Sequence, residues 1–171
     1  MSKKQVLKKD NIFTIILGST ALLIFILQFT PLLRYSSNGG VEANLPGWLV
    51  TYGGSYKNND VVVLNANFPF NICAFLAFYL PLICVGIWYL LKLFFKKSYN
   101  IFFIFIPLFA CIASIILLLT SKSVFLAGLN TASYTIYNGN VYLGIGTILA
   151  ISLNIVLIAC SISYLYRSIK K

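Results

Sequence analysis

The stretch "IFTIILGSTALLIFILQFTPLL" occupies positions 12–33, and its 22 residues include no charged side chain. A helix needs about 20 mostly apolar residues to cross about 30 Å of hydrocarbon. This stretch is therefore long enough to span a membrane. Three further windows are equally free of charge, and they cover positions 70–91, 101–120 and 141–166.

The whole composition agrees with this interpretation. Of 171 residues, 60% are hydrophobic and 9% are charged, whereas a soluble domain has about 25% charged residues. Four apolar helices of this length would leave a soluble protein almost no surface to face water. We therefore predict an all-α membrane protein, a single domain over 1–171 built as an antiparallel bundle of four transmembrane helices. The expected helices cover about 12–33, 70–95, 100–121 and 141–166.

Basic residues precede the first window, as they do in a signal peptide. Its apolar core exceeds the usual length of about 7–15 residues, and no A-x-A-like cleavage site follows. We expect an uncleaved first helix, and cleavage is the alternative.

The basic residues are distributed unevenly about the four windows. Ten lie at the two chain ends and in the short link between the second and third windows, and only Arg34, Lys57 and Lys122 lie on the other side. The positive-inside rule then predicts a multi-pass protein of the cell membrane with both termini in the cytoplasm. The same distribution accounts for the net charge of +10 by contact with the lipid bilayer, so no nucleic-acid partner is expected.

The two outer loops are expected at about 34–69 and 122–140. The first contains "GWLVTY" (47–52) and "VVVLNANF" (61–68), which are rich in strand-forming residues and are separated by a polar connector. We predict that residues near 47–52 and 61–67 pair antiparallel, and that part of 131–137 joins them. The result would be a small extracellular β-sheet or hairpin seated on the helix ends.

This layout resembles that of the claudin-like proteins, and Pro46, Gly47 and Trp48 carry the likeness. Claudins have a tryptophan-centred motif in the first outer loop, followed by a cysteine pair; this chain has the tryptophan and no cysteine in that loop. The resemblance implies four helices, a β element in the outer loops and internal termini. The chain also looks like small uncharacterised four-helix membrane proteins of AT-rich bacterial genomes, because Lys outnumbers Arg by eleven to two. Neither likeness transfers an activity, because layout alone does not carry function.

The residue inventory disfavours an enzyme. The chain has no His and three acidic residues, and its four cysteines lie within or beside the apolar windows. Metal sites and hydrolytic centres need ligands or bases that are missing here. We expect no catalytic residue, no metal and no cofactor.

Small and polar residues recur along one face of the first and fourth windows. The first series is Thr14, Gly18, Ala21 and Gln28, and the second is Gly146, Thr147, Asn154 and Ser161. We predict that these two faces form a helix-packing seam, with Gln28 at the Gly146–Thr147 turn and Asn154 beside Thr20. A polar pathway through the bundle is the alternative.

Aromatic residues of the outer loops form the candidate partner surface, which comprises Trp48, Tyr52, Tyr56, Tyr134 and Tyr137. Such residues suit protein contact, but they can equally pack a small sheet. The leading hypothesis is a non-enzymatic accessory or scaffold subunit that contacts a protein partner or a second copy through its outer β element. The alternative is a small oligomeric transporter or channel.

Overall fold

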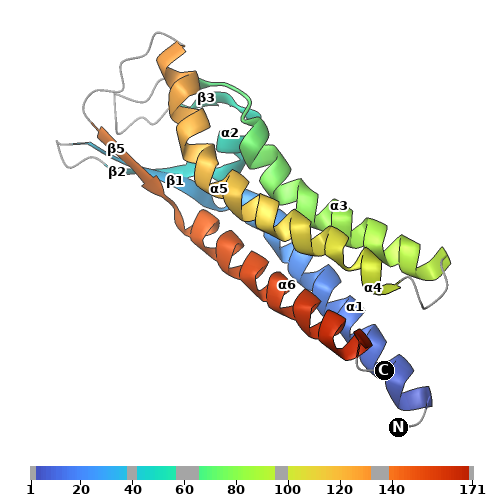
Figure 1. Ribbon diagram of the computed structural model, residues 1–171. Coiled ribbons are helices and arrows are strands. Elements are labelled where there is room, and N and C mark those ends of the chain that lie inside the picture. Colours follow the sequence, from blue (N-terminus) through green and yellow to red (C-terminus); the bar gives the residue numbers. More distant parts are fainter. Residues whose placement is uncertain (1–2, 38–41, 57–65, 95–99, 132–138, 170–171) are drawn as a thin grey trace.

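A computed structural model describes residues 3–37, 42–56, 66–94, 100–131 and 139–169 (Figure 1). The helices are α1 (Lys3–Ile26), the short 3-10 helix η1 (Leu27–Phe29), α2 (Gly47–Tyr52), α3 (Ile72–Phe94), α4 (Asn100–Phe103), α5 (Phe105–Thr131) and α6 (Ile145–Ile169). The strands are β1 (Pro31–Ser37), β2 (Glu42–Pro46), β3 (Gly54–Tyr56), β4 (Ala66–Phe68) and β5 (Gly139–Leu143).

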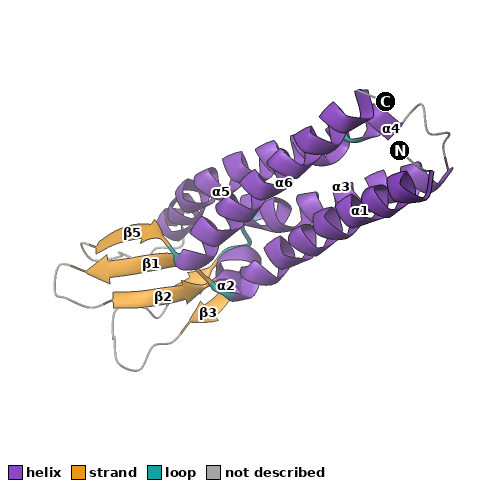
Figure 2. Cartoon of the chain, turned by 90° about the horizontal axis from the view of Figure 1, so that it is seen from below, coloured by secondary structure: helices purple, strands orange, loops and turns teal. Residues whose placement is uncertain are grey.

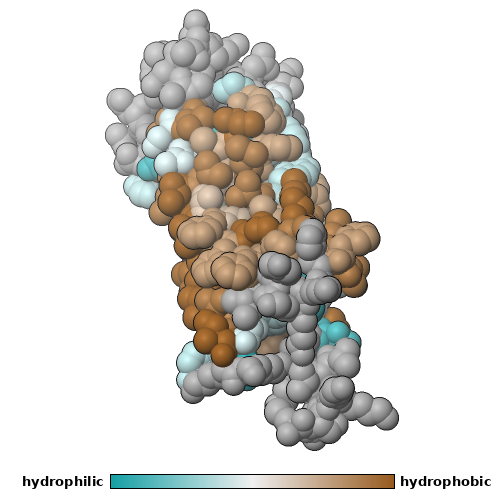
Figure 3. Space-filling model, turned by 45° about the vertical axis from the view of Figure 1, so that its right-hand side comes forward, coloured by the Kyte–Doolittle hydropathy of each residue, from teal (hydrophilic) through white to brown (hydrophobic). Residues whose placement is uncertain are grey.

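Within this described part of the chain, four segments are helical, long enough and apolar enough to cross a membrane. They are Asn11–Phe29, Ile72–Phe94, Phe105–Leu126 and Ile145–Ile169. A broad apolar band covers the middle of the molecule, and more hydrophilic side chains lie toward both ends (Figure 3). The predicted layout of four long apolar helices is confirmed.

The molecule has two different ends. The strands gather at one end of the bundle, and both chain termini lie at the other (Figure 2). We call these the sheet end and the terminal end. α1 and α5 run toward the sheet end while α3 and α6 run away from it, which gives the antiparallel arrangement expected for consecutive helices.

The first helix starts and ends earlier than the predicted range of 12–33. The helical backbone ends at Phe29, Thr30 is extended, and β1 starts at Pro31. Proline cannot donate the backbone hydrogen bond that a continuing helix needs. Apolar composition alone could not reveal this change, because Leu32 and Leu33 are as apolar as the helix before them.

β1 is the central strand of a three-stranded antiparallel sheet in the order β2-β1-β5. Leu33 lies opposite Leu45 of β2 and Leu143 of β5, and Tyr35 lies opposite Val141. Side chains alternate between the two faces of a strand. Leu33, Tyr35, Leu45 and Val141 accordingly belong to the core, whereas Arg34, Asn44 and Tyr142 are exposed on the other face. The predicted small sheet, completed by the second outer loop, is present.

The strands differ from those predicted. Residues 47–52 form α2 rather than a strand, so that prediction is wrong. Pro46 has extended backbone at the start of the helix, and Gly53 ends it with φ 76°. Strand propensity is easily overridden by tertiary packing, and here Leu49, Val50 and Thr51 are fully buried.

A hairpin is present in this region, but its strands occupy different positions from those predicted. β3 pairs antiparallel with β4, so that Gly54 lies opposite Phe68 and Tyr56 opposite Ala66. Positions 61–65 and 132–138, which the prediction also used, lie outside the described residues. The strand that the second outer segment contributes is β5 at 139–143, and it also shortens the helix predicted at 141–166 to begin at Ile145.

The third predicted helix, 100–121, is divided and extended. Pro107 cannot donate to Phe103, four residues earlier, and α4 ends at Phe103. α5 then runs to Thr131, so the first part of the predicted loop 122–140 is helical. Phe125, which lies beyond the predicted end at residue 121, is buried in the same core as the sheet residues, and this packing favours the longer helix.

Candidate functional site

α2 presents two large aromatic side chains on a rigid support. Trp48 and Tyr52 are four residues apart and therefore lie on the same helix face. They are 44% and 42% exposed, whereas Leu49 and Val50 are fully buried. Phe70, just before α3, is 52% exposed. We call Trp48, Tyr52 and Phe70 the outer aromatic surface.

The hydroxyl group of Tyr52 is fixed from two sides. It donates to Gln28 Oε1 at 3.0 Å and lies 2.6 Å from the hydroxyl oxygen of Tyr79. Burial of this hydroxyl, together with its bond to Tyr79, raises the pKa of Tyr52 to about 12. Tyr52 therefore remains neutral at physiological pH and ties α2 to η1 and α3.

A cluster of rings supports the outer aromatic surface from below. Phe75 stacks on Tyr79 with ring centroids 4.3 Å apart, and Tyr79 meets Phe25 edge-on at 5.0 Å. Phe75 also contacts Phe70 at 5.6 Å and Tyr52 at 6.2 Å. Offset and edge-on pairs of this kind add to the energy of burial. The cluster holds the exposed rings in place where α1, α2 and α3 meet.

Only part of the predicted partner surface can be placed. Trp48 and Tyr52 share one face of α2. Tyr56 lies in β3, with its side chain outside the description, and Tyr134 and Tyr137 lie outside the described residues. We did not predict from the sequence that Phe75 and Tyr79 would support the outer aromatic surface. The four-residue spacing of these rings was the signal for it, because that spacing places them on one face of α3.

The polar face of α1 lies against a different helix from the one predicted. Thr14 Oγ1 accepts a hydrogen bond from Lys92 Nζ of α3 at 2.8 Å. Gln28 of η1 accepts a hydrogen bond from Tyr52 of α2, although η1 also packs against α6. Gly18 lies beside α3 as well, and Ala21 is buried in the core. α1 packs on both α3 and α6, and a repeat on one helix cannot say which neighbour it faces.

The polar face of α6 is buried as predicted, but its partners differ. Thr147 Oγ1 donates to the carbonyl oxygen of Leu32 at 2.7 Å. Asn154 Nδ2 donates to Ser114 Oγ of α5 at 3.0 Å rather than to a group near Thr20. Thr20 is satisfied within its own helix by the carbonyl oxygen of Ile16.

The Asn154–Ser114 contact continues into a third helix. Ser114 Oγ donates to the carbonyl oxygen of Ala77 at 2.7 Å. That carbonyl lies four residues before Pro81, which has no N–H to donate to it. Ser114 thus satisfies an oxygen that the proline leaves unpaired, and Asn154, Ser114 and Ala77 link α6, α5 and α3.

Five buried side-chain atoms have no hydrogen-bond partner among the described residues. They are Gln28 Nε2, Thr51 Oγ1, Trp88 Nε1, Asn154 Oδ1 and Ser161 Oγ. Unpaired buried polar atoms are uncommon, and ordered water often occupies such positions.

Comparison with protein-family models, with curated proteins and with solved structures gives no match. The function is therefore argued from the geometry alone.

Proposed function

We propose that the protein is a non-enzymatic accessory or scaffold subunit of a membrane assembly, and that it contacts its partner through the outer aromatic surface. The observation that carries the proposal is the exposure of Trp48 and Tyr52 on a helix whose other side is fully buried. Tryptophan and tyrosine are enriched among residues that dominate binding energy, and rigid presentation lowers the entropy cost of association.

The position of these residues favours contact over a role in packing the sheet. Trp48 and Tyr52 lie on α2, outside both sheets, and the inner face of the three-stranded sheet is filled by other side chains such as Leu33 and Tyr35. An interfacial aromatic belt is the competing role for exposed rings near a membrane surface. Cross-linking distinguishes a protein contact from a lipid contact.

The contact is tested with a photoreactive amino acid placed at position 48 in intact cells. We expect one discrete adduct with an unlike protein, and we expect the same protein to copurify in fixed stoichiometry under mild detergent. Trp48→Ala should abolish the copurification. Tyr142 provides the matched control, because it is an exposed aromatic residue on the other face of the sheet, and Tyr142→Ala should leave the complex intact. A position-48 probe that labels only lipid would refute the proposal.

We further propose that the protein lies in a cell membrane with both termini in the cytoplasm and the sheet end outside. The support is the ratio of ten basic residues at the terminal end to three elsewhere. In a background without the four native cysteines, a single cysteine at Ser55 should react with an impermeant thiol reagent in intact cells. One at Ser2 should be shielded, and reaction there would reverse the orientation.

A small oligomeric transporter is the second candidate, and the unpaired Asn154 Oδ1 and Ser161 Oγ on the buried face of α6 favour it. Such atoms suit a polar path as well as a packing contact. Under the transporter hypothesis, Asn154→Leu should abolish solute flux while the protein stays folded. Under the scaffold hypothesis, the same change should leave the partner complex intact.

A further inference from the structure

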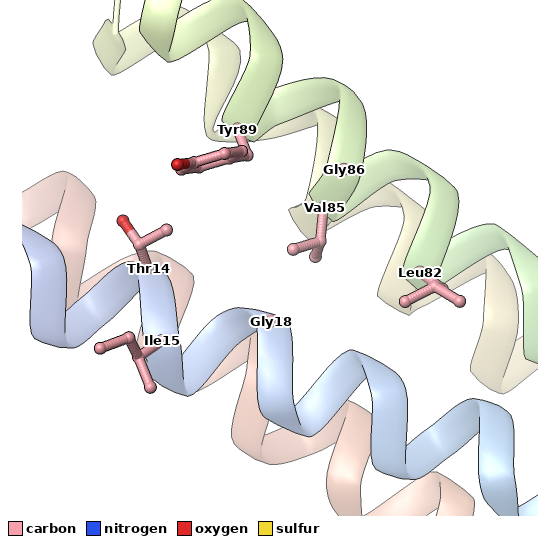
Figure 4. Close-up of a pocket in the computed structure, with 7 residues that line it drawn as sticks. All are labelled: Thr14, Ile15, Gly18, Leu82, Val85, Gly86 and Tyr89. Carbon is pink, nitrogen blue, oxygen red and sulfur yellow. The ribbon is translucent and has the colours of Figure 1, made fainter.

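An open groove runs between α1 and α3 toward the terminal end of the bundle, and its volume is about 350 Å³. Leu82 and Val85 of α3 point toward α1, and Gly18 and Gly86 lie on opposite walls (Figure 4). Thr14 and Tyr89 bring hydroxyl groups to one end of the groove. Apart from these two hydroxyl groups, the lining is apolar.

The two glycines leave space that no part of the described chain fills. A Cβ atom built on Gly18 or Gly86 would have no neighbour within 4 Å, and neither residue has the positive φ that requires glycine. Glycine is the weakest helix former apart from proline. Neither packing nor backbone conformation therefore explains the glycines, but a ligand that occupies the groove does.

A positively charged side chain, Lys92, lies next to Thr14 at the polar end of the groove. Lys92 Nζ donates to Thr14 Oγ1 at 2.8 Å and lies 5.2 Å from the ring centre of Trp88 and 5.8 Å from that of Tyr164. Thr14 lies three residues inside the start of the first span, which at about 1.5 Å per residue is about 4.5 Å deep. The amino group is thus near the depth of lipid headgroups.

The surrounding sequence makes this end strongly basic. Ten Lys and Arg residues, but only one acidic residue, Asp10, lie in the last turns of the second and fourth spans or in the segments 1–10, 95–99 and 170–171 that adjoin the spans. Such clusters attract anionic lipid headgroups. The attraction depends on the total charge and does not require Lys92 to lack other contacts.

We propose that the groove binds one anionic phospholipid, with an acyl chain between Gly18 and Gly86 and the phosphate beside Lys92. A transmembrane helix is too large for the site, because a helix about 10 Å wide occupies about 800 Å³ over the 10 Å between Leu82 and Tyr89. An acyl chain gains little free energy when it moves from the apolar bilayer interior into an apolar groove. Selectivity therefore comes from the headgroup, and the groove positions the chain.

The proposal is tested by native mass spectrometry of the delipidated protein in detergent. The probe is dioleoyl phosphatidylglycerol, and phosphatidylcholine with the same chains is the headgroup control. We expect one phosphatidylglycerol per chain, bound about tenfold more tightly than phosphatidylcholine, because the choline cation of phosphatidylcholine cancels the charge of its phosphate and the basic end of the bundle then attracts that lipid less.

Two substitutions extend side chains into the groove from positions where an added Cβ atom has no neighbour within 4 Å. Gly18→Leu and Gly86→Leu should each weaken phosphatidylglycerol binding about tenfold, while the thermal midpoint stays at or above that of the wild type. Ala159→Leu creates the same leucine side chain at an exposed position of α6, and this variant should bind phosphatidylglycerol normally.

Lys92 supplies an independent comparison that leaves the groove volume nearly unchanged. Lys92→Gln should lower the preference for phosphatidylglycerol, because Lys92 is the basic residue that contacts the groove lining through Thr14, and Lys92→Arg should retain it. Equal binding of the two lipids by the wild type, or normal phosphatidylglycerol binding by both leucine variants, would overturn the proposal. A lipid-independent dimer that Gly86→Leu abolishes would assign the groove to a second copy and would also overturn it.

Discussion

The contact between Ser114 and the Ala77 carbonyl makes a quantitative prediction about the Pro81 turn of α3. Ser114→Ala removes two hydrogen bonds, one accepted from Asn154 and one donated to Ala77. Polar contacts between membrane helices average about 0.6 kcal/mol and reach about 1.7 kcal/mol. We therefore expect Ser114→Ala to lower the free energy of unfolding by about 1.2 kcal/mol.

The loss of unfolding free energy caused by Ser114→Ala should be smaller in a protein that lacks Pro81. In Pro81→Ala, the new N–H of residue 81 can bond to the Ala77 carbonyl as in any helix. Ser114→Ala then loses only the contact with Asn154, about 0.6 kcal/mol. The difference between the two backgrounds is a coupling of about 0.6 kcal/mol, and the effect of Pro81→Ala itself cancels in the cycle.

Reversible unfolding in mixed detergent micelles measures all four proteins of the cycle. Ser152→Ala is the matched control, because Ser152 is exposed on α6 and donates within its own helix to Ile148; it should change the free energy of unfolding by less than about 0.5 kcal/mol. If Ser114→Ala lowers the free energy of unfolding equally with and without Pro81, Ser114 does not compensate for the hydrogen bond that Pro81 cannot donate to the Ala77 carbonyl.

Three further predictions follow from single contacts. Asn71 caps α3 by accepting a hydrogen bond from the Ala74 N–H, and it also donates to the carbonyl oxygen of Ser121. Asn71→Ala should therefore lower the free energy of unfolding, measured by chemical denaturation, by about 2 kcal/mol. Asn71→Ser keeps the cap and should lower it by about half as much. Gly146→Ala should lower the free energy of unfolding by about 1–3 kcal/mol, because the added Cβ atom would overlap Thr30 Oγ1 and approach the Pro31 carbonyl oxygen. An unchanged unfolding midpoint would contradict this prediction and would show that α6 can move away from β1. The raised pKa of Tyr52 means that the folded state holds the phenol proton more tightly than the unfolded state does. The stabilisation of the folded protein by this hydroxyl group is therefore complete below pH 10 and is lost as the pH rises to about 12. The difference in tyrosinate absorbance between wild type and Tyr52→Phe should therefore have its midpoint near pH 12, and a midpoint near 10 would contradict the buried hydroxyl.

The sequence by itself determined the four spans, because length and absence of charge are properties of each segment alone. It also indicated that the two termini share one side and that the outer segments contain a small sheet. The buried face of α6 followed from the seven-residue recurrence of Thr147, Asn154 and Ser161, since a helical repeat fixes which residues share a face.

Only the tertiary structure decided which neighbour each face meets. Thr14 of α1 and Gln28 of η1 were predicted to face α6, but their side chains bond to Lys92 of α3 and Tyr52 of α2, because the first helix has neighbours on two sides. The short segments also depended on their surroundings: 47–52 has strand-forming residues, yet it folds as α2 where Leu49 and Val50 can be buried. Pro81 is visible in the sequence, but the hydroxyl that satisfies the carbonyl it leaves unpaired comes from Ser114, 33 positions later. Periodicity describes one element at a time, whereas partners are chosen by packing all the elements together.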